Sequence, residues 1–359
     1  MRHILDGNAG SGLTRRAPRR ATAPLQRTAR SILRAARLRR VLPHVRAIAL
    51  ALAVHLLGCA PAAAAAPLDC GIAAPSDGPV VVTTRLAGVP AILRIPRVVD
   101  RPPIVLWHGF GPPAGERALM RALPLDGVPA VKVYLGLPLF GARSPAGGID
   151  EMIRRQRKDF ASLIFEPVVM GAARELPGVL AALRERHCMA AGERIGLFGF
   201  SAGGAAALVA LEQRAVRVSA AVTLNASTGL SASVAALERA TKRPYAWTPR
   251  ARLLARRSDA VPHAGEIAAG DPAVALLLIH GTDDETVSPA ETVSLYDALR
   301  RYYLRDRAGN RLRLSLVPGL SHSWGAGAAD ALLARDIGDW FDRFLPARDL
   351  PAGNESGRP

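Results

Sequence analysis

From Val80 onward the sequence alternates short apolar runs with longer helical segments, and this alternation limits the folds that the chain can adopt. The runs expected to form strands are 80–86, 91–95, 103–107, 131–137, 194–199, 219–225, 275–280 and 312–317. The segments expected to form helices are 151–187, 202–214, 289–305 and 329–344. Pro167 and Pro177 are expected to break the first of these helices. The pattern favours an α/β fold around a mostly parallel, doubly wound sheet.

One strand-to-helix junction carries the motif G-x-S-x-G, with Ser201 at its centre. The motif alone is weak, and its value depends on the structure around it. Here an apolar strand enters the motif and a helix of small residues leaves it, which predicts a sharp turn with a strained, exposed serine. The alternative is a Gly-rich turn that only packs, as in a nucleotide-binding fold. Neither G-x-G-x-x-G nor G-x-x-x-x-G-K-[ST] occurs in the chain, so we favour Ser201 as a nucleophile.

A serine nucleophile needs a base that a carboxylate orients, and both follow Ser201 in the sequence. Asp283 and Asp284 lie in the turn after the strand at 275–280, and His322 lies in the loop after the strand at 312–317. Loops at the carboxyl ends of parallel strands line one crevice. We therefore expect these side chains to converge on Ser201.

With these motifs the chain resembles the α/β-hydrolase family over about residues 80–346. The H-G-x-x-D-x-x-V pattern around the acid and the G-x-x-H pattern around the histidine are most similar to the dienelactone-hydrolase and prolyl-oligopeptidase-like branches. The resemblance implies a triad of Ser201, Asp284 and His322, in that order. Asp284 is preferred to Asp283 because it lies three residues before the valine of the pattern.

The same resemblance implies an oxyanion hole of two backbone N–H groups. One comes from Ala202, the residue after the serine, and the other from Phe110, the residue after His-Gly in the loop behind the third strand. The alternative for this Gly-rich loop is a flexible turn. The sequence shows no metal-site pattern, and no cofactor is expected.

The first part of the 359-residue chain is typical of an export signal. Residues 1–46 carry twelve Arg and one acid, and the apolar run at 47–58 is too short to span a bilayer comfortably. The run ends in a lipobox-like sequence at 56–59, where Cys59 would be lipidated, whereas 62–66 offers ordinary signal cleavage. An uncleaved anchor is less favoured. We expect an exported protein: a periplasmic or outer-membrane lipoprotein, or else a secreted one.

Cys70 and Cys188 remain after either kind of cleavage. An even cysteine count in an oxidising compartment favours a disulfide, and two unpaired thiols are the alternative. The net charge of +17 falls to +6 in residues 67–359, a surplus that we treat as spread over the body. We therefore expect no nucleic-acid partner, and membrane contact only through the lipid anchor.

The expected organisation is a basic segment with the export signal at 1–66, a catalytic domain at 67–345 and a flexible tail at 346–359. Residues 228–270 interrupt the strand–helix alternation and are either a small lid or a surface excursion with a solvated basic face. The leading function is a serine hydrolase that cleaves carboxylic esters of small or medium acyl groups through an acyl-enzyme. A prolyl-oligopeptidase-like peptidase acting on short peptides, a thioesterase or an acyltransferase is the alternative. A non-catalytic binding lipoprotein on the same fold is less favoured.

Overall fold

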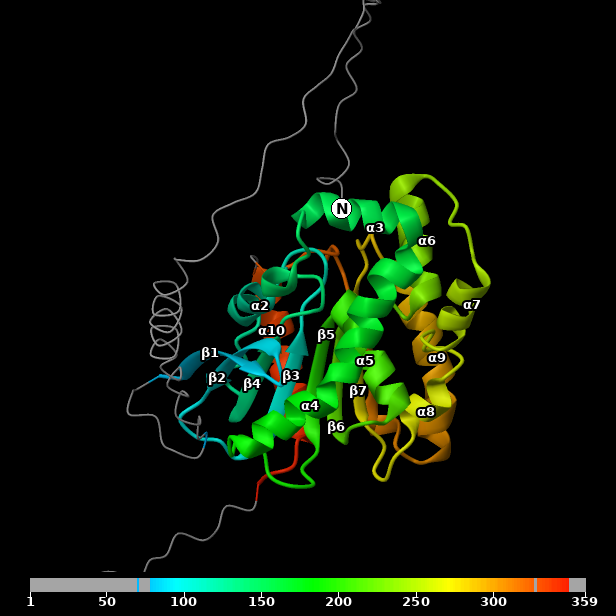
Figure 1. Ribbon diagram of the computed structural model, residues 1–359. Helices are drawn as coiled ribbons and strands as arrows, with labels where there is room; N and C mark the ends of the chain where they lie inside the picture. The colour runs from blue at the N-terminus through cyan, green and yellow to red at the C-terminus, as the bar shows by residue number, and fades with distance from the viewer. Residues whose placement is uncertain (1–69, 71–77, 326–327, 349–359) are drawn as a thin grey trace, which may run out of the picture. The chain divides into compact units, whose positions relative to one another are not determined.

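The computed structural model describes residues 70, 78–325 and 328–348, which contain an eight-stranded sheet with helices on both faces (Figure 1). The strands are β1 (Val80–Leu86), β2 (Val89–Ile95), β3 (Arg101–Trp107), β4 (Ala130–Leu135), β5 (Ile195–Phe200), β6 (Val218–Leu224), β7 (Ala275–Gly281) and β8 (Leu312–Val317). Their order in the sheet is β1-β2-β4-β3-β5-β6-β7-β8. β1 and β2 form an antiparallel hairpin, β2 is antiparallel to β4, and every pair from β4 to β8 is parallel. The predicted fold class is confirmed.

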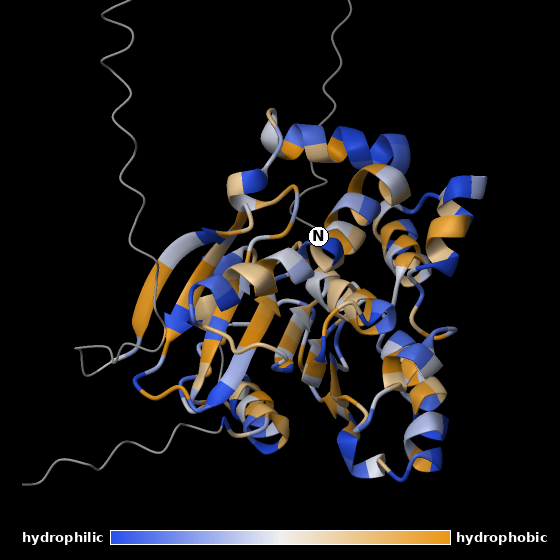
Figure 2. Cartoon of the chain, turned by 60° about the horizontal axis from the view of Figure 1, so that its bottom comes forward, coloured by the Kyte–Doolittle hydropathy of each residue, from blue (hydrophilic) through white to orange (hydrophobic). Residues whose placement is uncertain are grey.

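Burial along the strands explains why the central runs are apolar and the first strand is not. Every residue of β5, β6 and β7 is buried, as expected for strands that are covered on both faces. In β1, at the edge of the sheet, half-buried and exposed positions alternate up to the buried Leu86. Figure 2 shows the apolar residues gathered on the strands and on the inner sides of the helices. The carboxyl ends of β3 to β8 therefore meet at one edge, where the predicted site residues lie.

The helices form two layers. They are α2 (Glu116–Ala122), α3 (Gly148–Phe160), α4 (Gly171–Glu185), α5 (Ala202–Gln213), α6 (Leu230–Thr241), α7 (Pro249–Arg256), α8 (Ala264–Ala268), α9 (Pro289–Arg305) and α10 (Ala328–Phe344). One apolar cluster contains Leu119 of α2 and Ile337 of α10. The other contains buried residues of α4, α5, α6, α8 and α9. The sheet thus separates α2 and α10 from the remaining packed helices.

The expected breaks at Pro167 and Pro177 are wrong. A π-helix, η3 (Ala161–Met170), runs on directly into α4, and each proline lies inside a helical segment. A π-helical turn is wider than an α-helical one and accommodates a residue that cannot donate a backbone hydrogen bond. The chain departs from helical geometry at Asp159 instead, where φ is −166° and ψ is 96°. In Figure 1, α3 consequently crosses above the strands instead of continuing along α4.

The segment at 228–270 contains α6, α7 and α8, and it packs on its neighbours at several points. α6 and α7 contact η3, while α8 contacts α5 and α9. The hydroxyl of Tyr245 donates to Asp159 at 2.9 Å, and Arg250 pairs with Glu166 at 2.8 Å. These contacts tie the segment to the kink at Asp159 and to η3. Its role as a lid stays a prediction.

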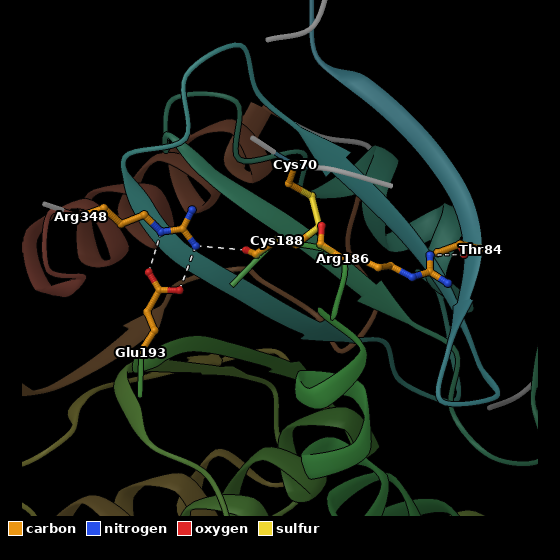
Figure 3. The surroundings of a disulfide bond; sticks show 6 residues. All are labelled: Cys70, Thr84, Arg186, Cys188, Glu193 and Arg348. Carbon is orange, nitrogen blue, oxygen red and sulfur yellow. Dashed lines mark hydrogen bonds and ion pairs between the residues drawn. A yellow bond between two sulfur atoms is a disulfide. The ribbon is translucent and has the colours of Figure 1, made fainter. Parts of the chain in front are cut away.

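Cys70 and Cys188 form a disulfide, as predicted (Figure 3). It joins Cys70 to the turn before β5. Beside it, the guanidinium of Arg348 forks onto Glu193 at 2.6 and 2.9 Å and donates to the carbonyl of Cys188 at 3.1 Å. Arg348, expected in a flexible tail, is therefore held on the domain by a charge-assisted bidentate pair.

The predicted export signal at 1–66, including Cys59, lies outside the described residues, as does 349–359. No helix in the described part of the chain is both long and apolar enough to cross a membrane. The domain boundaries and the mode of export stay predictions.

Candidate active site

Ser201 lies at the turn between β5 and α5, in a backbone conformation that few residues adopt. Its φ is 53° and its ψ is −117°, so the strained turn that the motif predicts is present. The expected exposure is wrong, because helix α5 and the neighbouring loops leave only 7% of Ser201 exposed. A side chain at Gly203 would collide with the backbone of Trp107 at the end of β3 and of His108 just after it. The two glycines of the motif therefore allow strand and helix to pack closely around the serine, as the G-x-S-x-G turn requires.

The structure brings Ser201, His322 and Asp284 together in one hydrogen-bonded chain. The Oγ of Ser201 lies 3.0 Å from Nε2 of His322, and Nδ1 of His322 lies 2.7 Å from Oδ2 of Asp284. With the carboxylate next to Nδ1, the proton of neutral His322 resides on Nδ1 and leaves Nε2 free to accept from the serine. This arrangement can transfer the serine proton to the histidine as the serine attacks a carbonyl group.

The carboxylate of Asp284 is buried and accepts hydrogen bonds at both oxygens. Oδ1 accepts from the backbone N–H groups of Thr286 and Val287, each at 2.8 Å. Burial alone raises the pKa of Asp284, but hydrogen bonds from His280 and His322 outweigh it and hold that pKa well below its usual range. Asp283 is exposed and accepts from the hydroxyl of Thr282. Of the two candidate acids, the structure places Asp284 beside His322.

His280 provides a second imidazole contact to the same carboxylate. Its Nε2 lies 3.1 Å from Oδ2 of Asp284 and 3.1 Å from the carbonyl of Val287. Its Nδ1 lies 2.6 Å from the hydroxyl of Thr292 on α9. Both neighbours of Nε2 are acceptors, so Nε2 carries the proton and, in a neutral ring, Nδ1 accepts from Thr292. His280 is fully buried, so this geometry is fixed by packing.

Asn225 connects the loops that carry the acid and the histidine. It follows β6, is fully buried, and has a φ of 46°. Its side-chain amide donates to the carbonyls of Ser321 at 2.8 Å and His322 at 3.1 Å, while its oxygen accepts from the N–H of Gly281 at 2.8 Å. The side chain thus fixes the position of His322 relative to β7.

The loop predicted to form the oxyanion hole approaches the serine closely. A Cβ at Gly109 would lie 2.7 Å from the Cβ of Ser201, so only glycine fits there. His108 is buried, and burial lowers its pKa. Its Nε2 accepts from the N–H of Leu137 at 3.2 Å, so its Nδ1 donates to the carbonyl of Gly109 at 2.7 Å and fixes the loop. Phe110 follows on this loop.

Ala202 is the first residue of α5, and the first N–H groups of a helix have no acceptor within it. These groups and the helix dipole favour negative charge beside Ser201. An aromatic surface flanks the site, because the ring of Phe110 stacks on that of Phe140 at 4.9 Å between centroids. The ring of Phe200 lies 5.4 Å from that of His322. Among the described residues, no group of three or more His, Cys, Asp or Glu side chains is arranged to hold a metal ion.

Three features of the site were not predicted from the sequence: the positions of Asn225 and Thr292 in it, and the contact of His280 with Asp284. A signal for Asn225 was present, since a polar residue directly after a buried parallel strand lies at the edge that holds the site. His280 precedes Asp284 by four residues, and the sequence indicated only that His280 lies just before the turn that carries the acid. Thr292 is one of several hydroxyl residues on α9, and only the packed structure identifies it.

The fold and site define an α/β-hydrolase, and comparisons with known proteins agree. The prolyl oligopeptidase family matches residues 173–347, just under half of the chain, and this range includes Ser201, Asp284 and His322. The chain therefore has the α/β-hydrolase fold, and its second half is similar to the prolyl oligopeptidase family.

Two solved structures show the same fold. TT1662 from Thermus thermophilus matches with a TM-score of 0.56 and 19% identity, over 75% of this chain and 99% of that one. The acylaminoacyl peptidase of Pyrococcus horikoshii matches with a TM-score of 0.53 and 18% identity, over 77% of this chain and 43% of that one. The chain thus spans less than half the length of the peptidase. No curated protein sequence matches the chain significantly.

Proposed function

We propose that this hydrolase of the α/β-hydrolase superfamily cleaves carboxylic esters through an acyl-enzyme on Ser201. The observation that carries the proposal is the continuous hydrogen-bonded chain from Ser201 Oγ through His322 to Asp284, at 3.0 and 2.7 Å. A serine hydroxyl becomes a useful nucleophile only when such a base accepts its proton.

In the proposed mechanism, Nε2 of His322 takes the proton as Oγ of Ser201 attacks the ester carbonyl. The carbonyl oxygen becomes an anion, which the backbone N–H groups of Ala202 and Phe110 stabilise. The intermediate then collapses, the bond to the alcohol oxygen breaks, and His322 returns the proton to the departing alcohol. A water molecule repeats the sequence on the acyl-enzyme and releases the carboxylic acid.

Two groups act as positioning residues in this scheme. His280 and Asn225 touch neither the serine nor the expected substrate atoms, but they hold Asp284 and His322 in place. The negative charge of Asp284 stabilises the imidazolium that forms on His322 during attack. Fixing that carboxylate beforehand avoids reorganisation during the reaction.

The acyl part of the substrate is assigned to the aromatic side of the site. Phe110 belongs to the proposed oxyanion loop, and its ring stacks on Phe140. This apolar surface supports an acyl group of hydrocarbon character. The match to the prolyl oligopeptidase family supports a peptidase as the second candidate, because both reactions use the same acyl-enzyme.

A series of p-nitrophenyl esters of increasing acyl length, set against peptide p-nitroanilides, tests this function. We expect turnover of the esters, and we expect Ser201→Ala and His322→Ala to abolish it down to the contribution of the oxyanion hole. Asp284→Asn should lose much more activity than Asp283→Asn, which serves as the matched control. Wild-type rates in Ser201→Ala would refute the mechanism, and faster cleavage of the anilides would favour the peptidase.

We also propose that the chain is exported, with Cys59 lipidated. The disulfide between Cys70 and Cys188 supports an oxidising compartment. Mass spectrometry of the wild-type protein should find a diacylglyceryl and acyl group on Cys59, and Cys59→Ala should release a soluble form. A free N-terminus near residue 66 without lipid would favour plain secretion.

A further inference from the structure

The positive surplus of the chain beyond its N-terminal segment is concentrated in twenty residues, contrary to the even spread that we expected. Residues 67–359 contain 35 Arg or Lys and 29 Asp or Glu. Seven of these basic residues and one of the acids lie within 238–257, so the rest of 67–359 is neutral. This stretch runs from the end of α6 through α7, which lie against each other in the fold (Figure 1).

Most of these basic side chains face solvent. Arg250 pairs with Glu166, and Arg239 donates to the carbonyl of Thr286 at 2.9 Å. The remaining five are exposed, and we call them the basic face: Lys242, Arg243, Arg252, Arg256 and Arg257. A local charge of this size attracts anions over several ångströms and is screened by salt.

The basic face also carries apolar groups at its surface. α7 buries Ala251, Leu254 and Ala255 against the domain, but Leu253 is 41% exposed, directly after Arg252 and three residues before Arg256. Trp247, in the loop before α7, is half-buried. A short helix that offers arginines around an exposed leucine, beside a tryptophan, is typical of segments that lie on a lipid surface.

We propose that the basic face binds the surface of an anionic phospholipid membrane. Clustered Arg and Lys attract acidic headgroups, while Leu253 enters the boundary between headgroups and acyl chains. The basic face combines charged and apolar side chains, which favours a membrane over a nucleic acid. A protein binds a nucleic acid strand through positive charge and aromatic stacking, and an exposed leucine has no role there. The contact does not require the proposed activity, so Ser201→Ala should bind as well as the wild type.

Tryptophan fluorescence gives a readout that is local to this face. Of the four tryptophans in the chain, Trp107, Trp324 and Trp340 are buried, with exposed fractions of 1%, 8% and 6%. A nitroxide on a lipid headgroup should therefore quench mainly Trp247. This readout is independent of the basic residues at 1–46, which could bind the same vesicles.

The experiment titrates the purified full chain with two kinds of nitroxide-bearing vesicles, phosphatidylcholine alone and phosphatidylcholine with phosphatidylglycerol. We expect quenching only with the anionic vesicles, lost in 1 M NaCl and absent in Trp247→Phe. The variant Arg243→Gln/Arg252→Gln/Arg256→Gln/Arg257→Gln should weaken binding on the order of a hundredfold or more. Its turnover of a soluble ester should match the wild type, which shows that it is folded.

A matched variant at the end of α9 and in the turn after it removes the same number of exposed arginines elsewhere: Arg300→Gln/Arg301→Gln/Arg305→Gln/Arg307→Gln. It should keep the quenching of the wild type. Equal quenching by the neutral vesicles, an equal loss in both variants, or no loss in the first would overturn the proposal. So would binding of a DNA duplex that depends on the basic face when the anionic vesicles fail to quench.

Discussion

Removal of the contact between His280 and Asp284 should slow the proposed reaction without changing substrate binding. Asp284 accepts four hydrogen bonds, and the one from His280 is the only one of the four that a substitution can remove without touching His322 or the backbone. A hydrogen bond to a charged group contributes about 1.5–3 kcal/mol. If that contribution is realised in the transition state, His280→Leu should lower kcat by roughly 10–150-fold, since about 1.4 kcal/mol corresponds to a factor of ten.

The assay is the pH profile of kcat/KM together with kcat and KM for one ester. Without the bond from His280, Asp284 is held less firmly against His322 and stabilises its imidazolium less, so the acid limb of the profile should move to lower pH. His280→Gln retains an N–H donor at a similar reach and should recover part of kcat. Thr292→Val removes the hydroxyl that fixes the ring and should shift the profile in the same direction as His280→Leu.

Ser294 offers a control on the same helix, because its exposed hydroxyl bonds the carbonyl of Ala290 and does not reach His280. Ser294→Ala should leave both the rate and the profile unchanged. If His280→Leu lowers only the melting temperature and keeps the wild-type kcat and acid limb, His280 is a packing residue and the reasoning fails.

Three further predictions follow from the same geometry. Gly109→Ala places a Cβ 2.7 Å from that of Ser201, which should displace the oxyanion loop. We expect kcat in ester assays to fall by about 10²–10³-fold while the circular dichroism spectrum stays that of the wild type. A variant with wild-type activity would contradict the placement of the loop. The pKa of Asp284 is lower in the folded state than in the unfolded chain, where it has the ordinary carboxyl value of about 3.9. Ionised Asp284 therefore stabilises the folded protein fully above that unfolded value, and the stabilisation is lost as the pH falls through it toward the folded pKa. The melting temperature of the wild type should therefore fall more steeply between pH 5 and 3 than that of Asp284→Asn, and parallel curves would argue against it. Cys70 and Cys188 should resist alkylation until reduction, and Cys188→Ala should lower the free energy of unfolding in urea by about 2–4 kcal/mol; two free thiols in protein isolated from an oxidising compartment would exclude the bridge.

The sheet was predictable because its strands are short apolar runs that only a sheet covered on both faces can bury. β7, β8 and α9 begin and end within one residue of the ranges expected from the pattern. The stretch from 151 to 187 was less predictable. Sequence rules place a helix break at proline, but here the π-helix accommodates Pro167, and the break falls at Asp159, whose carboxylate accepts from the N–H of Ser162 and from the hydroxyl of Tyr245.

The nucleophile, acid and base could be proposed because each follows a strand at the same edge of the sheet. The choice of Asp284 over Asp283 needed a family pattern, since both are carboxylates in one turn, and the structure separates them by burial. His280 and Asn225 could not be given roles, because those roles depend on which atoms meet across β6, β7 and the loop of His322. The concentration of positive charge at 238–257 was visible in the sequence, but we treated the net charge of residues 67–359 as evenly spread.

The most direct test of the proposed function is to react the purified protein with a fluorophosphonate and to map the adduct by tandem mass spectrometry. Because Ser201 hydrogen-bonds His322 next to two proposed oxyanion donors, we predict a stoichiometric adduct on Ser201. Labelling should disappear in Ser201→Ala and fall strongly in His322→Ala. An unlabelled wild-type protein that is folded by circular dichroism, or an adduct on another residue, would contradict the account.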